Sequence, residues 1–211
     1  MKICEIFRSI QGESTYAGLP CVFIRTSGCN LRCNYCDTTY AYEEGREMTE
    51  DEVFAQAVSY RTGTVEITGG EPLMQKSVYP LIKRLLDSGF KVLIETNGSV
   101  NIKGVDPRAI IIMDIKTPGS KMSGSLDTGN LELLKPEDEV KFVIADRHDY
   151  EWTRDFISAN KLEAICTILL APVFGRLSPR DLSQWILDDN LNVRLNLQLH
   201  KYIYDPEERG V

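Results

Sequence analysis

The sequence predicts an α/β fold in which parallel strands alternate with helices. Short runs rich in β-branched residues and leucine recur along the chain, and segments with helix start and stop signals separate them. Several of these runs are apolar on both faces, as buried parallel strands tend to be. The pattern therefore favours a parallel β/α barrel or part of one.

The expected strands begin in the first third of the chain and recur to its last quarter. Each is a run of strand length in which Val, Ile or Leu predominate. They cover residues 22–25, 64–67, 91–94, 109–115, 140–144, 165–170 and 193–197.

The expected helices lie between these strands. Thr49 and Glu52 form a capping box at the start of one helix, and Pro179 after Ser178 takes the first position of another. Two further helices end at residues that adopt the left-handed conformation readily. These are 77–88, which should stop at Gly89, and 149–159, which should stop at Asn160.

One long stretch, from Lys116 to Glu139, interrupts the alternation. It contains several Gly, Ser and Asn turn signals and no sustained helical period. Long loops at strand ends often hold ligands. Two interpretations stay open, a surface loop and a lid over a binding site.

Composition favours a single domain over residues 1–211. With 211 residues, 43% of them hydrophobic, the chain can bury one continuous core. No segment approaches the about 18 apolar residues of a membrane span, and the amino terminus has no signal-peptide pattern. A net charge of -7 argues against nucleic-acid binding, which depends on Lys and Arg neutralising phosphates. We expect a cytoplasmic protein with no membrane or nucleic-acid partner.

Three of the six cysteines, Cys29, Cys33 and Cys36, share one loop directly after the strand that starts near residue 21. A structural zinc site has four protein ligands, and an electron-transfer 4Fe-4S cluster normally takes four thiolates. Three ligands with no fourth nearby indicate a metal site with one open position. In parallel barrels the loops at the carboxyl ends of the strands build the active site. A zinc knuckle would need a fourth ligand from His148, His200 or another cysteine, and none of these has ligand-like spacing.

The remaining cysteines, Cys4, Cys21 and Cys166, are scattered through apolar runs. They make a poor disulfide framework, so a reducing compartment is expected. In such runs a cysteine is expected to be a buried, inert thiol.

A second motif, Gly69-Gly70-Glu71-Pro72, follows Thr68 at the end of the next strand. The two glycines let polar groups of a ligand approach the backbone, and Glu71 can hold an ammonium group or stabilise the turn. Together with the cysteine loop, this motif resembles the radical S-adenosylmethionine (SAM) superfamily. There, three cysteines hold a 4Fe-4S cluster whose open iron binds SAM, and electron transfer yields a 5′-deoxyadenosyl radical.

The resemblance also implies which residues bind SAM. Gly69, Gly70 and Glu71 would face its methionyl group. Polar groups at the tips of later strands would surround the methionyl and ribose groups. These are Glu95, Asn97, Asp114, Ile115 and Lys116. Outside this context, Asn97 with Gly98 would be an ordinary turn, and Asp114 with Lys116 an exposed ion pair.

Further motifs narrow the resemblance. They are the run 5–14 (EIFRSIQGES), the run 18–25, Cys36-Asp37-Thr38, and His200-Lys201-Tyr202 before Pro206. Over essentially its full length the chain resembles the 7-carboxy-7-deazaguanine synthase family. This implies an incomplete TIM-like barrel with reduced helix content, a homodimer and a flavodoxin-like electron donor. It also implies ring contraction of 6-carboxy-5,6,7,8-tetrahydropterin with loss of ammonia, in which SAM acts as a catalyst.

The same resemblance implies a set of substrate residues. Arg25 offers a planar fork to the substrate carboxylate. The pterin edge would be read by the Ile10-Gln11-Gly12 backbone, the Gln11 amide and Thr68. Glu13, Ala171, Pro172 and Pro206 complete the expected substrate-binding residues, with Ala171 and Pro172 acting through their backbone. The role of the tail, 207–211, stays open.

Thr38 matches the family's Mg²⁺ ligand, and a lone threonine would need water and substrate oxygens to complete the coordination. Alternatives stay open for the polar residues: Arg25 could pair with Glu13, and Thr38 could cap a turn. For the whole chain there are two other interpretations. One is a glycyl-radical activase, which shares the cysteine spacing and small size but acts on a protein partner. The other is a non-enzymatic cluster-binding or zinc-binding module.

Overall fold

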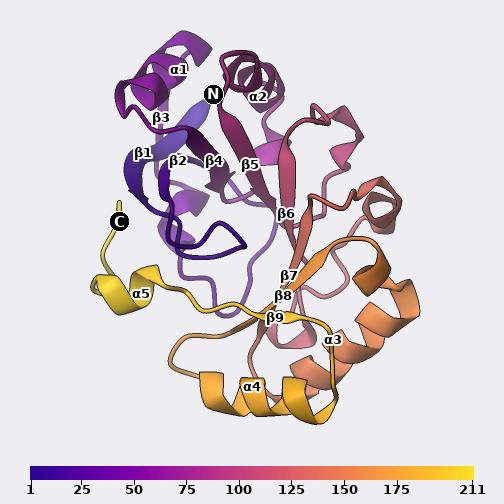
Figure 1. Ribbon diagram of the computed structural model, residues 1–211. Helices are drawn as coiled ribbons and strands as arrows, with labels where there is room; N and C mark the ends of the chain where they lie inside the picture. Colours follow the sequence, from indigo (N-terminus) through magenta and orange to yellow (C-terminus); the bar gives the residue numbers. More distant parts are fainter.

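The computed structural model describes residues 1–211, and its centre is one nine-stranded sheet with strand order β3-β1-β2-β4-β5-β6-β7-β8-β9 (Figure 1). From β2 to β9 all neighbouring strands are parallel, while β1 pairs antiparallel with β2 and with β3. The strands are β1 (Lys2–Ile10), β2 (Pro20–Thr26), β3 (Arg46–Glu47), β4 (Thr64–Gly69), β5 (Lys91–Thr96), β6 (Ile110–Asp114), β7 (Glu139–Ile144), β8 (Thr167–Pro172) and β9 (Arg194–Leu195).

The sheet is an open, partial barrel, because its edge strands β3 and β9 do not pair with each other. Helix content is modest, and no α-helix lies between β5 and β7. The helices are α1 (Glu50–Ser59), α2 (Val78–Asp87), α3 (Arg147–Asn160), α4 (Pro179–Asp188) and α5 (His200–Ile203). None of them is long and apolar enough to cross a membrane. The predicted α/β class and reduced helix content are confirmed.

Strand periodicity divides the sheet into an apolar outer face and a polar inner face. On β4, Val65 and Ile67 are fully buried in the core cluster, which also contains residues of α1 to α4. Glu66 and Thr68 point the other way, into a cavity. Because successive side chains of a strand alternate between faces, one short run builds both the core and the site.

Strand β1 was not among the sequence-based expectations. Its sequence mixes polar and apolar residues without a regular period, and most are only half buried, as on an antiparallel strand near the margin of a sheet. The search for runs that are apolar on both faces therefore passed over it. The strand matters for function, because Ile10 at its end and residues of the following loop line the cavity.

The helix predictions hold with small shifts. Helix α2 ends before Gly89, which is left-handed (φ +87°) as expected. Helix α3 begins earlier than expected because Asp146 caps it by accepting a hydrogen bond from the Asp149 amide. The left-handed residue at its end is Lys161 (φ 53°) and not Asn160, so that prediction is wrong. The Asn160 side chain instead donates to the Phe156 carbonyl (2.9 Å).

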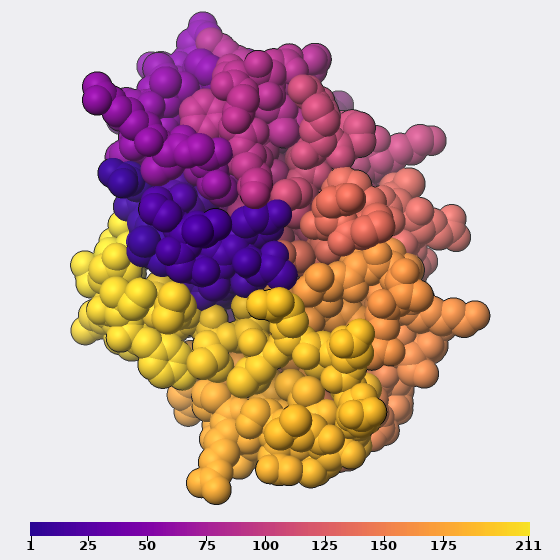
Figure 2. All heavy atoms as spheres, in the orientation of Figure 1, coloured from indigo at the N-terminus to yellow at the C-terminus, as the bar shows by residue number.

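The loop after β1 and the segment after β9 lie against each other, which Figure 2 shows as adjoining indigo and yellow surfaces. The Leu199 amide donates to the Gly12 carbonyl (2.8 Å), and the Gln198 side chain donates to Glu13 Oε1 (2.8 Å). The two ends of the open sheet are thus bridged by hydrogen bonds that do not belong to a strand ladder.

The stretch from Lys116 to Glu139 is tied to its surroundings by hydrogen bonds. Buried Asn130 donates to the carbonyls of Gly98 and Val100 and accepts from the Ile102 amide. The Ser120 carbonyl accepts from Asn34 in the cysteine loop (3.0 Å). Within the stretch before β7, only Lys116 lines the cavity. Of the two interpretations, the structure favours an anchored loop.

Replacing Asn130 with alanine should lower the free energy of unfolding by about 2 to 4 kcal/mol, because three buried backbone groups lose their partners. Chemical denaturation measures the change. Asn101→Ala is the matched control, since that exposed residue caps a short turn and bonds only to the exposed Asp127 side chain, and its replacement should cost about 1 kcal/mol. Equal losses in the two variants would contradict the anchoring role of Asn130.

Candidate active site

A cavity of about 730 Å³ opens at the carboxyl ends of the parallel strands. Most of the predicted site residues line it. These are Ile10, Gln11, Gly12, Glu13, Arg25, Cys29, Cys33, Cys36, Thr38, Thr68, Gly69, Gly70, Glu95, Asn97, Asp114, Lys116 and Pro206. Four predicted residues do not line it: Glu71, Ile115, Ala171 and Pro172. The last two form the end of β8, and the cavity wall is made instead by Val173 and Phe174 directly after them.

The three loop cysteines present their free thiols to this cavity. Cys29 Sγ accepts hydrogen bonds from the Leu31 amide (3.4 Å) and from Asn97 Nδ2 (3.9 Å). Burial raises the pKa of the Cys29 and Cys33 thiols, and in each case the Lys116 ammonium opposes it. Iron displaces the thiol protons on binding, and donors around a sulfur stabilise the thiolate. Three sulfurs beside one shared cavity fit a cluster that keeps one iron open.

The other cysteines lie away from the cavity. Cys21 is fully buried, while Cys4 and Cys166 are half buried. Burial raises the pKa of all three thiols. The expectation of a buried, inert thiol thus holds for Cys21, whereas Cys4 and Cys166 are only half buried.

The paired glycines let the tip of β4 pack against the cysteine loop. A Cβ atom on Gly70 would lie 2.0 Å from the Gly28 carbonyl oxygen and 2.8 Å from Cys29 Cβ. Gly69 adopts φ +141°, which side chains rarely tolerate. The backbone therefore requires glycine at both positions, whether or not a ligand is bound.

Glu71 lies behind the cavity, not in it. Its side chain is fully buried and accepts hydrogen bonds from Thr96 Oγ1 (2.8 Å) and from the amides of Leu73 (3.0 Å) and Asn97 (2.7 Å). Burial raises the pKa of this carboxyl, and the three donors oppose that rise. The structure thus shows Glu71 stabilising the turn, and it connects the tips of β4 and β5. Ile115 is likewise a core residue.

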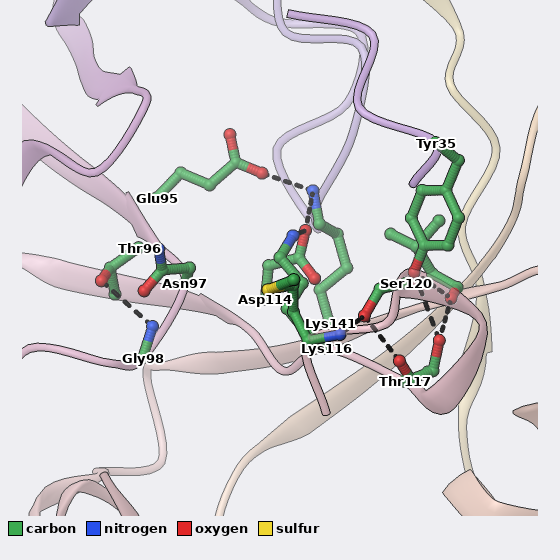
Figure 3. Close-up of polar contacts among 12 residues, drawn as sticks. Tyr35, Glu95, Thr96, Asn97, Gly98, Asp114, Lys116, Thr117, Ser120 and Lys141 are labelled. Carbon is green, nitrogen blue, oxygen red and sulfur yellow. Dashed lines mark hydrogen bonds and ion pairs between the residues drawn. The ribbon is translucent and has the colours of Figure 1, made fainter. Parts of the chain in front are cut away.

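A buried ionic network lies across the inner face of the sheet (Figure 3). Lys141 Nζ contacts Glu95, Glu13 Oε2 (2.8 Å) and Asp114 Oδ2 (3.7 Å). Lys116 Nζ lies 2.8 Å from the same Asp114 oxygen. The interpretation of Asp114 and Lys116 as an exposed pair is wrong, because their side chains are only 12% and 15% exposed.

The network sets the charge of Glu95. Burial by itself would raise the pKa of this carboxyl, but the Lys141 ammonium and the Thr68 hydroxyl hold it at about 2. Because this folded-state pKa lies below the usual carboxyl value, the ionised group stabilises the fold above that value. The stabilisation is lost as the pH falls toward about 2.

Sequence reasoning missed Lys141, although a signal was present. It is a lone lysine in the apolar strand 140–144, and it pairs in register with Asp114 on β6. A charged residue in the middle of a buried strand is rare unless it has a partner. The same signal marks Glu66 within the strand 64–67.

Arg25 pairs with Glu5, and not with Glu13 as the alternative interpretation had it. Its Nε donates to Glu5 Oε1 (2.7 Å), which also accepts from the Tyr40 hydroxyl (2.8 Å). The two terminal amino groups of Arg25 make no hydrogen bond within the protein. They are free to bind an anionic group in the cavity that Arg25 lines.

Thr38 does not cap a turn with its side chain. Its hydroxyl donates to Asp37 Oδ1 (3.1 Å), and the other oxygen of Asp37 is 2.7 Å from Lys201 Nζ. The Lys201 ammonium, together with the hydrogen bonds from Lys201 and Thr38, holds the pKa of Asp37 below its usual range. One wall of the cavity therefore carries an ionised carboxylate next to Thr38.

The tail 207–211 lies at the mouth of the cavity, together with Pro206. The Arg209 guanidinium lies 3.7 Å from the centroid of the Tyr40 ring and pairs with Glu44 (3.0 Å). Beside this mouth, a Cβ atom on Gly12 would come within 2.1 Å of the His200 ring. Glycine is therefore required at position 12 for the close approach of His200. The placement of the tail at the cavity was not predicted from the sequence.

Replacing Lys141 with methionine should lower the free energy of unfolding at neutral pH by about 3 kcal/mol or more. The change leaves Glu13, Glu95 and Asp114 facing one another without their shared cation. Thermal or chemical unfolding measures this loss. The exposed pair of Lys83 with Asp87 provides the control, since Lys83→Met should cost less than about 1 kcal/mol. A Lys141→Met protein as stable as this control would contradict the network.

Comparisons with known proteins show the family to which the chain belongs. Residues 23–181 match the model of the radical SAM superfamily. The 7-carboxy-7-deazaguanine synthases of Koribacter versatilis and Chlorobaculum tepidum are each 46% identical to the chain, covering all of it and 100% and 97% of their own lengths. The crystal structure of QueE from Escherichia coli superposes with a TM-score of 0.79 at 24% identity over 94% of both chains, which shows the same fold. The chain therefore belongs to the radical SAM superfamily and, within it, to the 7-carboxy-7-deazaguanine synthase family.

Proposed function

We propose that the chain converts 6-carboxy-5,6,7,8-tetrahydropterin to 7-carboxy-7-deazaguanine with loss of ammonia, as a radical SAM carbon-nitrogen lyase. The observation that carries this proposal is the shared cavity. It places three free thiols in the same enclosure as an arginine whose amino groups have no protein partner. Relatives of matching length carry the synthase name, and none of the features above favours a glycyl-radical activase.

The thiols of Cys29, Cys33 and Cys36 are proposed to hold a 4Fe-4S cluster. When bound, the cluster and SAM supply an electron and a carbon radical that removes a hydrogen atom from the substrate. SAM would lie next to the cysteine loop, against residues at the tips of β4, β5 and β6. The proposed contacts are Gly69, Gly70, Glu95, Asn97, Asp114 and Lys116. Glu71 and Ile115 would support the site from behind it.

Arg25 is the proposed anchor for the substrate carboxylate. Its guanidinium is held in place by Glu5 through Nε, which leaves both terminal amino groups to form a charge-assisted pair of hydrogen bonds. The Ile10-Gln11-Gly12 backbone, Glu13 and Thr68 line the same cavity and are proposed to contact the ring. Pro206 and the residues directly after Ala171 and Pro172 would form the remaining wall of the cavity around the substrate.

Thr38 is proposed to contribute to a Mg²⁺ site beside the substrate. Its hydroxyl and the Asp37 carboxylate are oxygen donors on one wall of the cavity. Magnesium keeps several of its waters and needs few protein ligands, so two oxygens and a substrate carboxylate suffice.

Further proposals concern the whole chain. A single sheet with one core cluster supports one domain over residues 1–211. We also propose a homodimer in the cytoplasm, with a flavodoxin-like protein as the electron donor. The oligomeric state is checked by ultracentrifugation of the anaerobically purified protein.

Anaerobic reconstitution tests the proposed function. The purified protein should be brown and hold about four irons. With dithionite, SAM and Mg²⁺ it should convert the carboxytetrahydropterin to a product lighter by one ammonia, detected by mass spectrometry. A colourless, zinc-loaded protein would contradict the cluster. A brown protein that cleaves SAM but leaves the pterin unchanged would contradict the substrate.

A further inference from the structure

Glu66 is the one cavity-lining acid on the inner face of the sheet that has no basic partner. It lies in the middle of β4, pairs in register with Phe23 on β2, and is only 3% exposed. The neighbouring acids Glu13, Glu95 and Asp114 each contact a lysine, whereas Glu66 forms no ion pair. Burying a carboxyl group without a cationic partner costs free energy of folding. Such a group at the wall of a cavity is therefore a candidate functional residue.

The only hydrogen-bond partner of Glu66 is the side chain of Gln11. Gln11 Oε1 accepts from the Glu13 backbone amide (2.9 Å), which can only donate, so the orientation of the Gln11 amide group is determined. Its Nε2 therefore donates to Glu66 Oε2. The second oxygen, Oε1, has no protein partner, and the residue lines the cavity. A ligand in the cavity would meet Oε1.

The surrounding charges favour the neutral form of Glu66. The network next to it holds three acidic side chains and two lysines, and Arg25 on the adjacent strand is already paired with Glu5, so a further negative charge would lack compensation. Burial raises the pKa of Glu66 well above its usual value. The negative charges of Glu95 and Glu13 add to this effect, while Lys141 and Arg25 oppose it. Because Oε2 accepts from Gln11, the proton of the neutral acid belongs on Oε1, where it points to the ligand.

We propose that Glu66 is a specificity-determining residue that donates a hydrogen bond from Oε1 to the carbonyl oxygen of the substrate's pyrimidinone ring. This inference rests on the proposed function and assigns a role to a residue outside the expected substrate set. A hydrogen-bond donor at this position favours binding of a ring with an oxo group facing it. It disfavours a ring with an amino group in the same place, because two donors would then face each other. Gln11 acts through Glu66 as a positioning residue.

Two substrate analogues and two variants test the proposal. The unaltered enzyme, loaded with cluster and SAM, should bind 6-carboxytetrahydropterin at least about tenfold more tightly than its 4-amino analogue. Glu66→Gln should keep that preference within about threefold, since its oxygen can accept from Gln11 while its amide group donates to the ligand. Glu66→Met has a similar volume but no donor, so its preference should fall close to one. Iron content reports whether each variant assembles its site.

Glu139→Gln is the matched control. Glu139 is also a buried acid on the inner side of a strand, but it bonds to Thr15 and does not line the cavity, so its replacement should leave the preference unchanged. An unaltered enzyme that prefers the 4-amino analogue would overturn the neutral-donor role, since an ionised Glu66 would accept from that amino group. A Glu66→Met protein that keeps the full preference would overturn the role of Glu66 and leave the proposed function standing. Failure of the unaltered enzyme to convert the pterin at all would overturn the proposed function and this inference with it.

Discussion

Replacing Cys33 with alanine should abolish both cluster assembly and turnover. The three thiols around the cavity are the only cysteines that line it, so the loss of one leaves two ligands for a cluster that needs three. Iron analysis should fall from about four irons per chain to nearly none, and the visible absorption of the reconstituted protein should disappear with it.

Cys166→Ala provides the control, because this half-buried cysteine lies outside the cavity and its thiol has no role in the proposed site. That variant should keep its iron and its activity. A Cys33→Ala protein that retains both the cluster and turnover would overturn the ligand assignment.

Replacing Arg25 with alanine should weaken pterin binding while SAM cleavage in the absence of substrate persists. The lost contact is a hydrogen-bonded charge pair, worth about 1.5 to 3 kcal/mol. The dissociation constant of the pterin should therefore rise roughly 10- to 150-fold. Calorimetric titration measures the binding, and formation of 5′-deoxyadenosine measures the cleavage.

Glu5→Gln separates this effect from general damage to the site. It removes the charge that orients Arg25 but leaves the guanidinium in place, so binding should weaken much less than in Arg25→Ala. Equal losses of pterin binding and SAM cleavage in Arg25→Ala would place Arg25 outside the proposed carboxylate site.

The parallel part of the fold could be predicted because its strands are short apolar runs with distinct helix signals between them. The runs 64–67 and 91–94 each lie within an observed strand. Strand β1 was not predicted because its sequence mixes polar and apolar residues without a strand period, and most of its residues are only half buried. The end of α3 was placed one residue early, since Lys161 takes a conformation for which Asn160 has the higher intrinsic preference.

The site could be predicted where a motif lies within a few residues, as in the cysteine loop. It could not be predicted where distant residues combine. The partner of Arg25 is Glu5, on the adjacent antiparallel strand, and the bond between Gln11 and Glu66 spans 55 positions. Glu71 shows a further limit, because the sequence left two roles open and only the buried acceptor geometry shows the turn-stabilising one.

The most direct measurement is the ratio of product formed to SAM consumed by the reconstituted enzyme with limiting SAM. If the enclosed cavity holds the pterin beside SAM, and the hydrogen atom returns after rearrangement, each SAM molecule should support many turnovers. The proposed function predicts more 7-carboxy-7-deazaguanine than SAM supplied, with little 5′-deoxyadenosine. Product equal to or below the SAM consumed, or no conversion of the pterin, would contradict it.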